Sequence, residues 1–425
     1  MTKLRMVDFG KAIRNFLFRT IGLPDESDMT TRKALIRFDK ATKFFLTSLR
    51  NGYEQNDGKL VLKIRLRNIF LRSAIIFTII RTTVFLFVDN YYFDLFLANP
   101  FSRNKSTKSF LFLILMDLIC IWLFTLREYC LHVEETGRFK VFRVFYQIAK
   151  NGLDPVKLGL SHRQCKKFHR KMHFLMIHGY RMILITSVLI FVASTALKVL
   201  NFSSYLTAVH LIFLVAHIPI ECFSILTVSA SGISFFINFG SYLALNLSRF
   251  NTLTEIIKKN SVVISSNSTA FRNMNNRVVY FLNHFDKIDT HWKYLLQYYF
   301  FMISLTADFG FFVAVILDFG SDIVTKILAF YSIVGHFSGM MGYYLFANFY
   351  HETIDLHKRY VSIILNADSA SRVDKLKALG ILERTGGPHK GVSIGDFCRL
   401  KRSTCIRYLL ENASFLLLLR CNIRS

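Results

Sequence analysis

The sequence contains seven apolar stretches that are long enough, or nearly long enough, to cross a lipid bilayer. A spanning helix needs about 20 mainly apolar residues to cross a hydrocarbon core of about 30 Å. The stretches lie at residues 69–88, 110–126, 174–197, from 206 onward, 294–319, 326–350 and 403–423. Lipid offers the backbone no hydrogen-bond partners, so spans of this kind must be helices. The predicted fold class is therefore all-α, a polytopic membrane protein with seven transmembrane helices.

The composition of the 425-residue chain argues against a set of soluble domains. Apolar residues make up 52 % of the chain and charged residues only 19 %, whereas soluble proteins keep charged residues near a quarter. This apolar content also excludes a disordered chain. The excess of 54 basic over 28 acidic residues could indicate a nucleic-acid partner. The positions of the charges decide against that partner.

Lys and Arg are distributed unequally between the two sides of the predicted membrane. The segments 1–68, 127–173, 249–293 and 351–403 together hold 43 of them, and the loops on the opposite side hold five. Basic loops stay in the cytoplasm, where lipid headgroups are anionic. We therefore expect a multi-pass plasma-membrane protein with a cytoplasmic N-terminus and an extracellular C-terminus. The lipid bilayer accounts for the net charge of +26 without nucleic acid.

Two segments need separate interpretation. Residues 1–68 begin without a signal peptide and read as a cytoplasmic N-terminal segment, in which Ala41–Leu49 could lie along the bilayer surface. The fourth apolar stretch continues to Leu247, long enough for two crossings. Two crossings would place 17 basic residues outside, so we favour one span that extends into the cytoplasm. Residues of about 235–293 and 351–403 would then form a cytoplasmic helical anchor.

Five positions outside the candidate ligand site carry smaller predictions. Asn104 and Asn201 head glycosylation sequons in predicted outer loops. Pro219 should kink the fourth span. His169 and His173 lie among cations on a cytoplasmic helix, where contact with lipid headgroups is a better explanation than metal binding.

Ionisable residues inside spans are costly and therefore informative. Arg81 and Asp117 lie at similar depth, so an interhelical ion pair, snorkelling of Arg81 and ligand contact are all open. His217, Asp308 and His336 share a second depth and could form the polar floor of a ligand pocket. Its aromatic walls would come from Tyr298, Phe309, Phe312 and Tyr331. The alternatives are separate burial of each polar residue in the bundle and a metal site of two His and one Asp.

Three segments resemble the arthropod gustatory and odorant receptor superfamily. They are Tyr242–Leu253 after the fourth span, Leu282–Tyr294 before the fifth, and Val392–Phe397 before the last. In the last span, Ser414 and Phe415 stand at the family's Thr-Tyr position, and four leucines follow. The family's Gln-Phe is replaced by Arg420-Cys421 or Cys421-Asn422, so the chain resembles a divergent gustatory receptor.

The resemblance implies a ligand-gated cation channel, with residues 69–423 as its receptor-channel domain. Family members are tetramers, homomeric or heteromeric, whose last helices line the pore and whose outer halves enclose a small-molecule ligand. By this resemblance Phe415, Leu416 and Leu419 would form a hydrophobic gate. Arg420 near the outer mouth would oppose cations. The ligand-contact candidates are His217, Asp308, His336, Tyr331, Phe312, Arg81 and Asp117.

Two other functions stay open from the sequence. A G-protein-coupled receptor would need its N-terminus outside, which the charge distribution opposes. A secondary transporter would show inverted repeats and broken helices, and only the Gly-containing fourth stretch hints at it. No catalytic arrangement, metal site or cofactor motif is predicted, and enzymatic activity has no support in the sequence.

Overall fold

Long helices make up most of the computed structural model, which describes residues 28–47, 62–101, 107–136, 148, 152–200, 207–316, 322–387, 391–396 and 398–424. The N-terminal half contains α2 (Asp28–Phe44), α4 (Leu62–Phe87), α5 (Tyr91–Phe96), α6 (Thr107–Glu135), α8 (Pro155–Leu158) and α9 (His162–Leu200). The C-terminal half contains α10 (Ala208–Lys259), α11 (Ser261–Ser266), α12 (Ser268–Phe311), the π-helical turn η2 (Phe312–Ile316), α13 (Asp322–Leu365), α14 (Arg372–Gly386) and α15 (Arg402–Arg424). A short antiparallel hairpin, β1 (Ser393–Ile394) with β2 (Cys398–Arg399), precedes α15.

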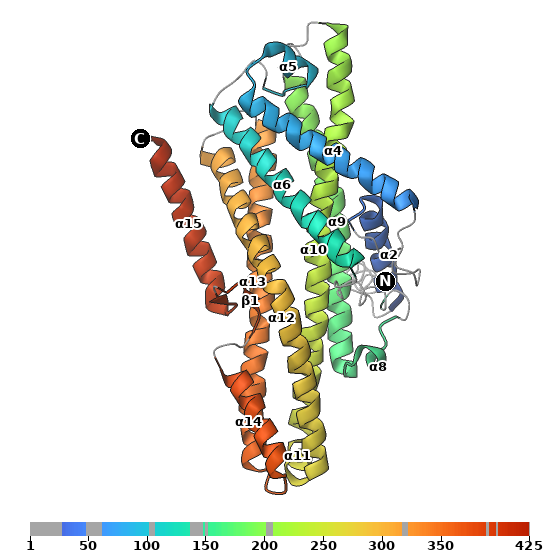
Figure 1. Cartoon of the computed structure of the whole chain (residues 1–425), viewed down its shortest axis with the longest axis vertical. Coiled ribbons are helices and arrows are strands. Elements are labelled where there is room, and N and C mark those ends of the chain that lie inside the picture. Colours follow the sequence, from blue (N-terminus) through green and yellow to red (C-terminus); the bar gives the residue numbers. More distant parts are fainter. Residues whose placement is uncertain are drawn as a thin grey trace, which may run out of the picture.

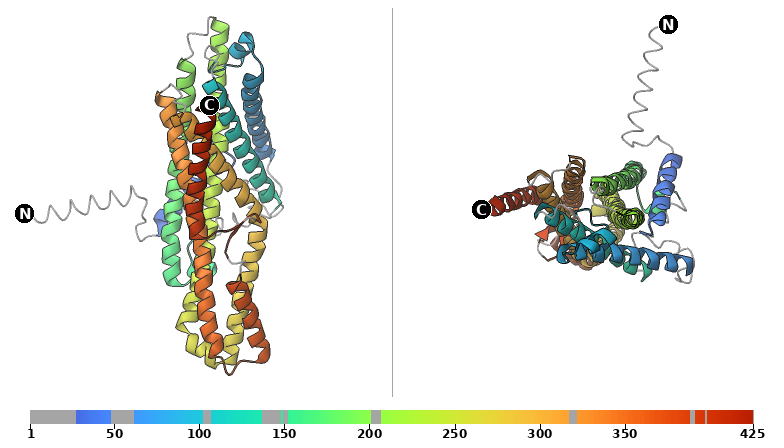
Figure 2. Two further views of the ribbon diagram at one scale, coloured as in Figure 1. Left: turned by 90° about the vertical axis from the view of Figure 1, so that its left-hand side faces the viewer. Right: turned by 90° about the horizontal axis from the view of Figure 1, so that it is seen from above.

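The helices form an elongated bundle (Figures 1 and 2). Helices α9, α10, α12 and α13 run along its long axis, and α4 and α6 cover them at one end. Helices α11 and α14 lie at the opposite end, and α15 lies on the outside with its C-terminal end apart from the other helices. Helix α10 packs on α9, and α12 packs on α13. The two pairs form the frame on which the other helices rest.

Helix α10 confirms that the fourth apolar stretch is one helix. It begins after Thr207, whose hydroxyl accepts a hydrogen bond from the His210 amide at 3.4 Å, and such a cap satisfies one of the open amides of a helix start. The helix then runs for 52 residues, with Pro219 inside it. Two crossings would require the chain to reverse direction within this stretch, and it does not.

Five described helices are long and apolar enough to span a membrane. They contain Ile64–Phe87, Ser109–Glu135, His162–Val199, Ala208–Lys259 and Trp292–Val315. These match the first five predicted spans. The remaining two predicted spans fall within α13 and α15, and their crossing of the membrane stays a prediction.

The end of the bundle around α11 has its own hydrophobic core. Apolar residues of α10, α12, α13 and α14 pack together there, among them Ile257, Phe271, Leu356, Tyr360 and Ile381. Tyr360 is fully buried and donates a hydrogen bond to the Asn275 side chain. The two segments predicted as an anchor therefore pack against each other. Their cytoplasmic location stays a prediction.

The N-terminal segment differs from the prediction. Helix α2 ends at Phe44, so Ala41–Leu49 is not a surface helix; its last two residues lie outside the described part. Phe38 of α2 is fully buried against α9, where a Cβ on Gly179 would meet its ring at 2.8 Å. Helix α2 is therefore held by packing against α9.

The headgroup contact predicted for His169 and His173 is also wrong. Both imidazoles are buried, and both lie within hydrogen-bond distance of the Thr31 hydroxyl, at 2.5 and 3.0 Å. They face α2 instead of lipid, because the opposite face of α9 carries the cations.

Candidate functional site

Three charged side chains meet inside the apolar helices α4, α9 and α10. Arg81 of α4 forms an ion pair with Glu221 of α10, and Lys198 of α9 reaches the same carboxylate at 3.0 Å. Ser194 donates a hydrogen bond to its other oxygen at 2.9 Å. Arg81 is 3 % exposed and Lys198 is 1 % exposed. Buried charges require such pairing, because the interior cannot replace their hydration.

This cluster corrects two predictions. Arg81 pairs with Glu221, whereas the buried Asp117 carboxylate accepts a hydrogen bond from the Thr83 hydroxyl at 2.9 Å. The predicted interhelical bridge exists for Arg81 with a different partner. Lys198 follows the third predicted span and is one of the five basic residues counted on the outer side, but it lies inside the bundle, where its ammonium also reaches the Ala98 carbonyl at 3.4 Å.

His217 does not join Asp308 and His336 in a common pocket floor. Its ring donates from Nε2 to the Phe96 carbonyl of α5 at 3.1 Å and stacks on Phe77 of α4 at a centroid distance of 5.8 Å. It is buried and faces α4 and α5. The predicted convergence of three residues is wrong for His217.

Asp308 and His336 do meet, so two of the three residues considered for a pocket floor lie together. The His336 Nε2 atom lies 3.3 Å from the Asp308 carboxylate, and its Nδ1 atom lies 3.5 Å from the Tyr408 hydroxyl of α15. A neutral imidazole with its proton on Nε2 suits both neighbours. The pair therefore reaches the last helix, which the sequence did not suggest.

A second polar contact joins α15 to the same region. Ser304 of α12 donates a hydrogen bond to the Asn412 side chain. Asn412 lies one turn after Tyr408, so both project from the same face of α15. We call Ser304, Asp308, His336, Tyr408 and Asn412 the α15 polar contact. It links α12 and α13 to α15 through polar contacts, which are stronger in an apolar environment than in water.

The aromatic residues expected as pocket walls lie in different places. Phe312 is fully buried in a cluster with Phe85 and Phe112, and Phe309 packs against it. Tyr331 donates to the Thr186 carbonyl of α9 at 3.4 Å, and Tyr298 reaches the Thr125 hydroxyl at 3.0 Å. The four rings do not surround a shared space.

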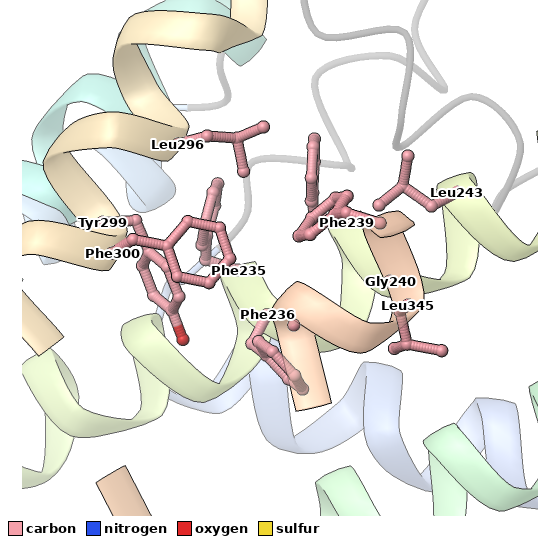
Figure 3. Close-up of a pocket in the computed structure, with 11 residues that line it drawn as sticks. Phe235, Phe236, Phe239, Gly240, Leu243, Leu296, Tyr299, Phe300 and Leu345 are labelled. Atoms are coloured by element: carbon pink, nitrogen blue, oxygen red, sulfur yellow. The ribbon is translucent and has the colours of Figure 1, made fainter. Parts of the chain in front are cut away.

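An apolar cavity lies elsewhere, between α10, α12 and α13 (Figure 3). Its lining is aromatic and aliphatic, and includes Phe235, Phe239, Tyr299, Phe300 and Phe346. The space left between these side chains is about enough for one water molecule. In this conformation it is a packing void and has no room for an organic ligand.

The last helix exposes one apolar stripe and packs the other side on its own chain. Ile406, Leu410 and Leu417 are each more than 60 % exposed, and spacings of four and seven residues place them on one face. Leu416 and Leu419 pack against the cluster around Phe312. Phe415 is 36 % exposed and Arg420 is exposed. Two of the three predicted gate residues therefore point toward the bundle.

Three further sites were considered from the sequence: two glycosylation sites and, as an alternative to the ligand pocket, a metal site. Asn104 and Asn201 lie outside the described residues. Within the described ranges, no three His, Cys, Asp or Glu residues are placed to hold a metal ion.

The comparisons with known proteins come from structure alone, since no family model and no curated protein matches the sequence. The insect olfactory receptor OR5 from Machilis hrabei, in complex with eugenol, aligns with a TM-score of 0.64 and 12 % identity. The alignment covers 91 % of this chain and 98 % of that receptor. A second structure of the same receptor aligns with a TM-score of 0.59, 13 % identity and the same coverage.

The fold is that of an insect olfactory receptor. At this identity the similarity concerns the fold and does not extend to the site residues. The similarity covers nearly the whole of that receptor.

Several residues of these clusters were missed from the sequence. Glu221 interrupts the fourth apolar stretch, and the rule that singled out Arg81 and Asp117 would have found it. Lys198 was assigned to a loop because the third span was ended at Leu197, three residues before α9 ends. Tyr408 and Asn412 carry no comparable signal, because the search was for ionisable residues and both side chains are uncharged at neutral pH.

Proposed function

We propose that this chain is a chemosensory receptor of the insect type that acts as a ligand-gated cation channel. The observation that carries the proposal is the fold match over 98 % of an insect olfactory receptor. The gustatory subtype rests on the sequence resemblance of the segments Tyr242–Leu253, Leu282–Tyr294 and Val392–Phe397.

The proposed topology has seven spans, with α13 and α15 as the sixth and seventh. The N-terminus and the bundle around α11 lie in the cytoplasm, and the C-terminus lies outside. The charge distribution supports this orientation, since 43 Lys and Arg residues fall on the proposed inner side. The plasma membrane is the proposed location.

The proposed ligand is a small organic molecule, as eugenol is for the similar receptor. Asp308, His336 and Tyr331 are the ligand-contact candidates retained on α12 and α13. His336 is one-fifth exposed and touches α15 through Tyr408, so a ligand that moves this ring would also act on the last helix. Arg81, Asp117, His217 and Phe312 are assigned to helix packing, since each already has a buried contact.

The proposed assembly is a tetramer in which α15 lines the pore. Support comes from the stripe of Ile406, Leu410 and Leu417, which the described part of the chain leaves mostly exposed. In a membrane span such a face contacts either lipid or a neighbouring helix, and we propose that it contacts the α15 helices of the other subunits. Leu410 and Leu417 replace Leu416 and Leu419 as gate candidates. The proposed tetramer predicts a mass of four chains in native mass spectrometry.

The test is the current carried by the purified protein in planar bilayers without any G protein. A panel of small organic compounds that includes eugenol should evoke cation current. The variant His336→Ala should lose the response, while Asp368→Asn on the exposed surface beyond α13 should keep it. A folded protein that carries no current with the panel would overturn the proposal.

A further inference from the structure

The outward face of α9 changes character along its length. Its first three turns expose Arg163, Lys166, Lys167 and Arg170. Phe174 follows, 40 % exposed, and further along the helix Leu184, Ile185, Val188, Phe191 and Val192 are exposed apolar residues. A helix that passes from the lipid headgroups into the hydrocarbon typically carries its side chains in this order: cations, then an aromatic ring, then aliphatic groups.

The four cations Arg163, Lys166, Lys167 and Arg170, here called the α9 cation cluster, are weakly neutralised by the protein. Helix α9 contains no acidic residue in its 39 positions. Within the described residues, the ion pair of this cluster is that of Arg163 with Glu255, at the long distance of 3.9 Å. The Glu255 carboxylate is closer to the Gln164 amide, at 2.7 Å. Glu352 of α13 attracts Lys167 electrostatically from the flank.

Helix α2 adds to the positive charge. It packs along α9 through Thr31 and Phe38, and its outer side exposes Arg32, Lys33 and Arg37. The α9 cation cluster itself extends over seven residue steps, from Arg163 to Arg170, which is about 10 Å at the rise of an α-helix. Four cations within that distance complement the charge of a lipid headgroup with several phosphates better than the charge of a headgroup with a single net negative charge.

We propose that the α9 cation cluster binds a phospholipid whose headgroup carries several phosphates, in the leaflet that faces the anchor bundle. The phosphates lie against the four cations, and the acyl chains lie along the part of the outward face that begins at Phe174 and ends near Ile185. Clusters of four to eight cations next to a membrane span attract such lipids. The site rests on the proposed membrane orientation, but its test does not require channel activity.

The test is native mass spectrometry of the full-length protein in detergent, titrated with phosphatidylinositol 4,5-bisphosphate. One lipid per chain should bind. The variant Arg163→Gln/Lys166→Gln/Lys167→Gln/Arg170→Gln should weaken binding at least about tenfold, since each cation near the headgroup contributes. The double variant Lys166→Gln/Arg170→Gln, which leaves the Arg163–Glu255 ion pair in place, serves if the quadruple variant does not fold.

A matched control removes the same charge from the far end of the bundle. Lys258, Lys259, Arg272 and Arg277 are exposed around α11, and their replacement by Gln should change lipid binding less than twofold. An equal loss in both variants would overturn the site as a net-charge effect. Phosphatidylserine bound as tightly would overturn the choice of headgroup. Equally tight binding of inositol trisphosphate would show that the site binds a soluble anion and not a lipid. Equally tight binding of a polyglutamate peptide would show that it binds an acidic protein.

Discussion

At the scale of single residues, Glu221 determines how three apolar helices are joined. Its carboxylate is the shared partner of Arg81 and Lys198, and its second oxygen is held by Ser194. One carboxylate thus pairs with two buried cations, from α4 and α9. The cluster resists separation of these helices, because each unpaired charge would be left in an apolar environment.

Replacing this carboxylate should destabilise the protein strongly. Glu221→Gln removes the anion and leaves two buried cations, which we expect to lower the free energy of unfolding by about 3–5 kcal/mol. The measurement is denaturant unfolding in mild detergent. Glu135→Gln, at the exposed end of α6, is the control and should change it by less than about 0.5 kcal/mol. Equal effects of the two variants would contradict the assigned role.

Glu352, two residues beyond the proposed sixth span, should give an unusual pH dependence. Burial raises the pKa of its carboxyl, and the Asp355 carboxylate raises that pKa further. The unfolded chain therefore releases this proton at lower pH than the folded protein, so ionisation opposes folding. The stability from protonated Glu352 is complete below the unfolded pKa and is lost as pH rises through the folded pKa.

Glu352→Gln should accordingly raise the thermal midpoint at pH 7, and the gain should vanish below about pH 4, where both states are protonated. Unfolding curves of both proteins across this range provide the measurement. In an Asp355→Asn background the gain should be smaller, since part of the repulsion has gone. A gain that is the same at every pH would show that charge plays no part.

At the scale of elements, α15 rests on α13 through a close contact at Gly339. A Cβ at this position would lie 2.8 Å from the Tyr408 hydroxyl and 3.2 Å from its ring. Glycine therefore allows Tyr408 to reach His336 and Asn412 to lie over Ser304. A side chain here would lift the last helix from the α15 polar contact.

Gly339→Ala should destabilise the protein by about 1–3 kcal/mol through this overlap. Gly240→Ala is the matched control, because its Cβ meets nothing within 4 Å and the helix interior of α10 favours alanine. It should stabilise by about 0.5–1 kcal/mol. Thermal unfolding compares the two. Adding Tyr408→Leu to Gly339→Ala should relieve the overlap, and a lack of any relief would refute the contact.

At the scale of the whole molecule, the orientation in the membrane follows from charge. Asn104 and Asn201 should carry glycans, since both fall in proposed outer loops. Asn267 heads a sequon too, but it caps α12 by accepting a hydrogen bond from the Ala270 amide at 3.1 Å and lies at the proposed cytoplasmic end.

Removal of glycans by a glycosidase should therefore shift the gel mobility of the wild type and leave Asn104→Gln/Asn201→Gln unchanged. Asn267→Gln should migrate like the wild type. A tag at residue 1 should stain permeabilised cells alone, and a tag at residue 425 should stain intact cells. Glycans on Asn267 would reverse the proposed topology.

The helical membrane fold and the position of its helices were predictable from the sequence, because partition into lipid depends on local apolar content. Apolar content alone left residues 206–247 open to two crossings, and the positions of the basic residues favoured the single helix that α10 confirms. The direction in which each side chain points was not predictable, because a span that is apolar on all sides has no preferred face. Only the tertiary structure decided that Arg81 meets Glu221, that His217 turns away from His336, and that Leu416 faces its own chain. Those outcomes depend on helix rotation and crossing, which arise from packing between distant segments.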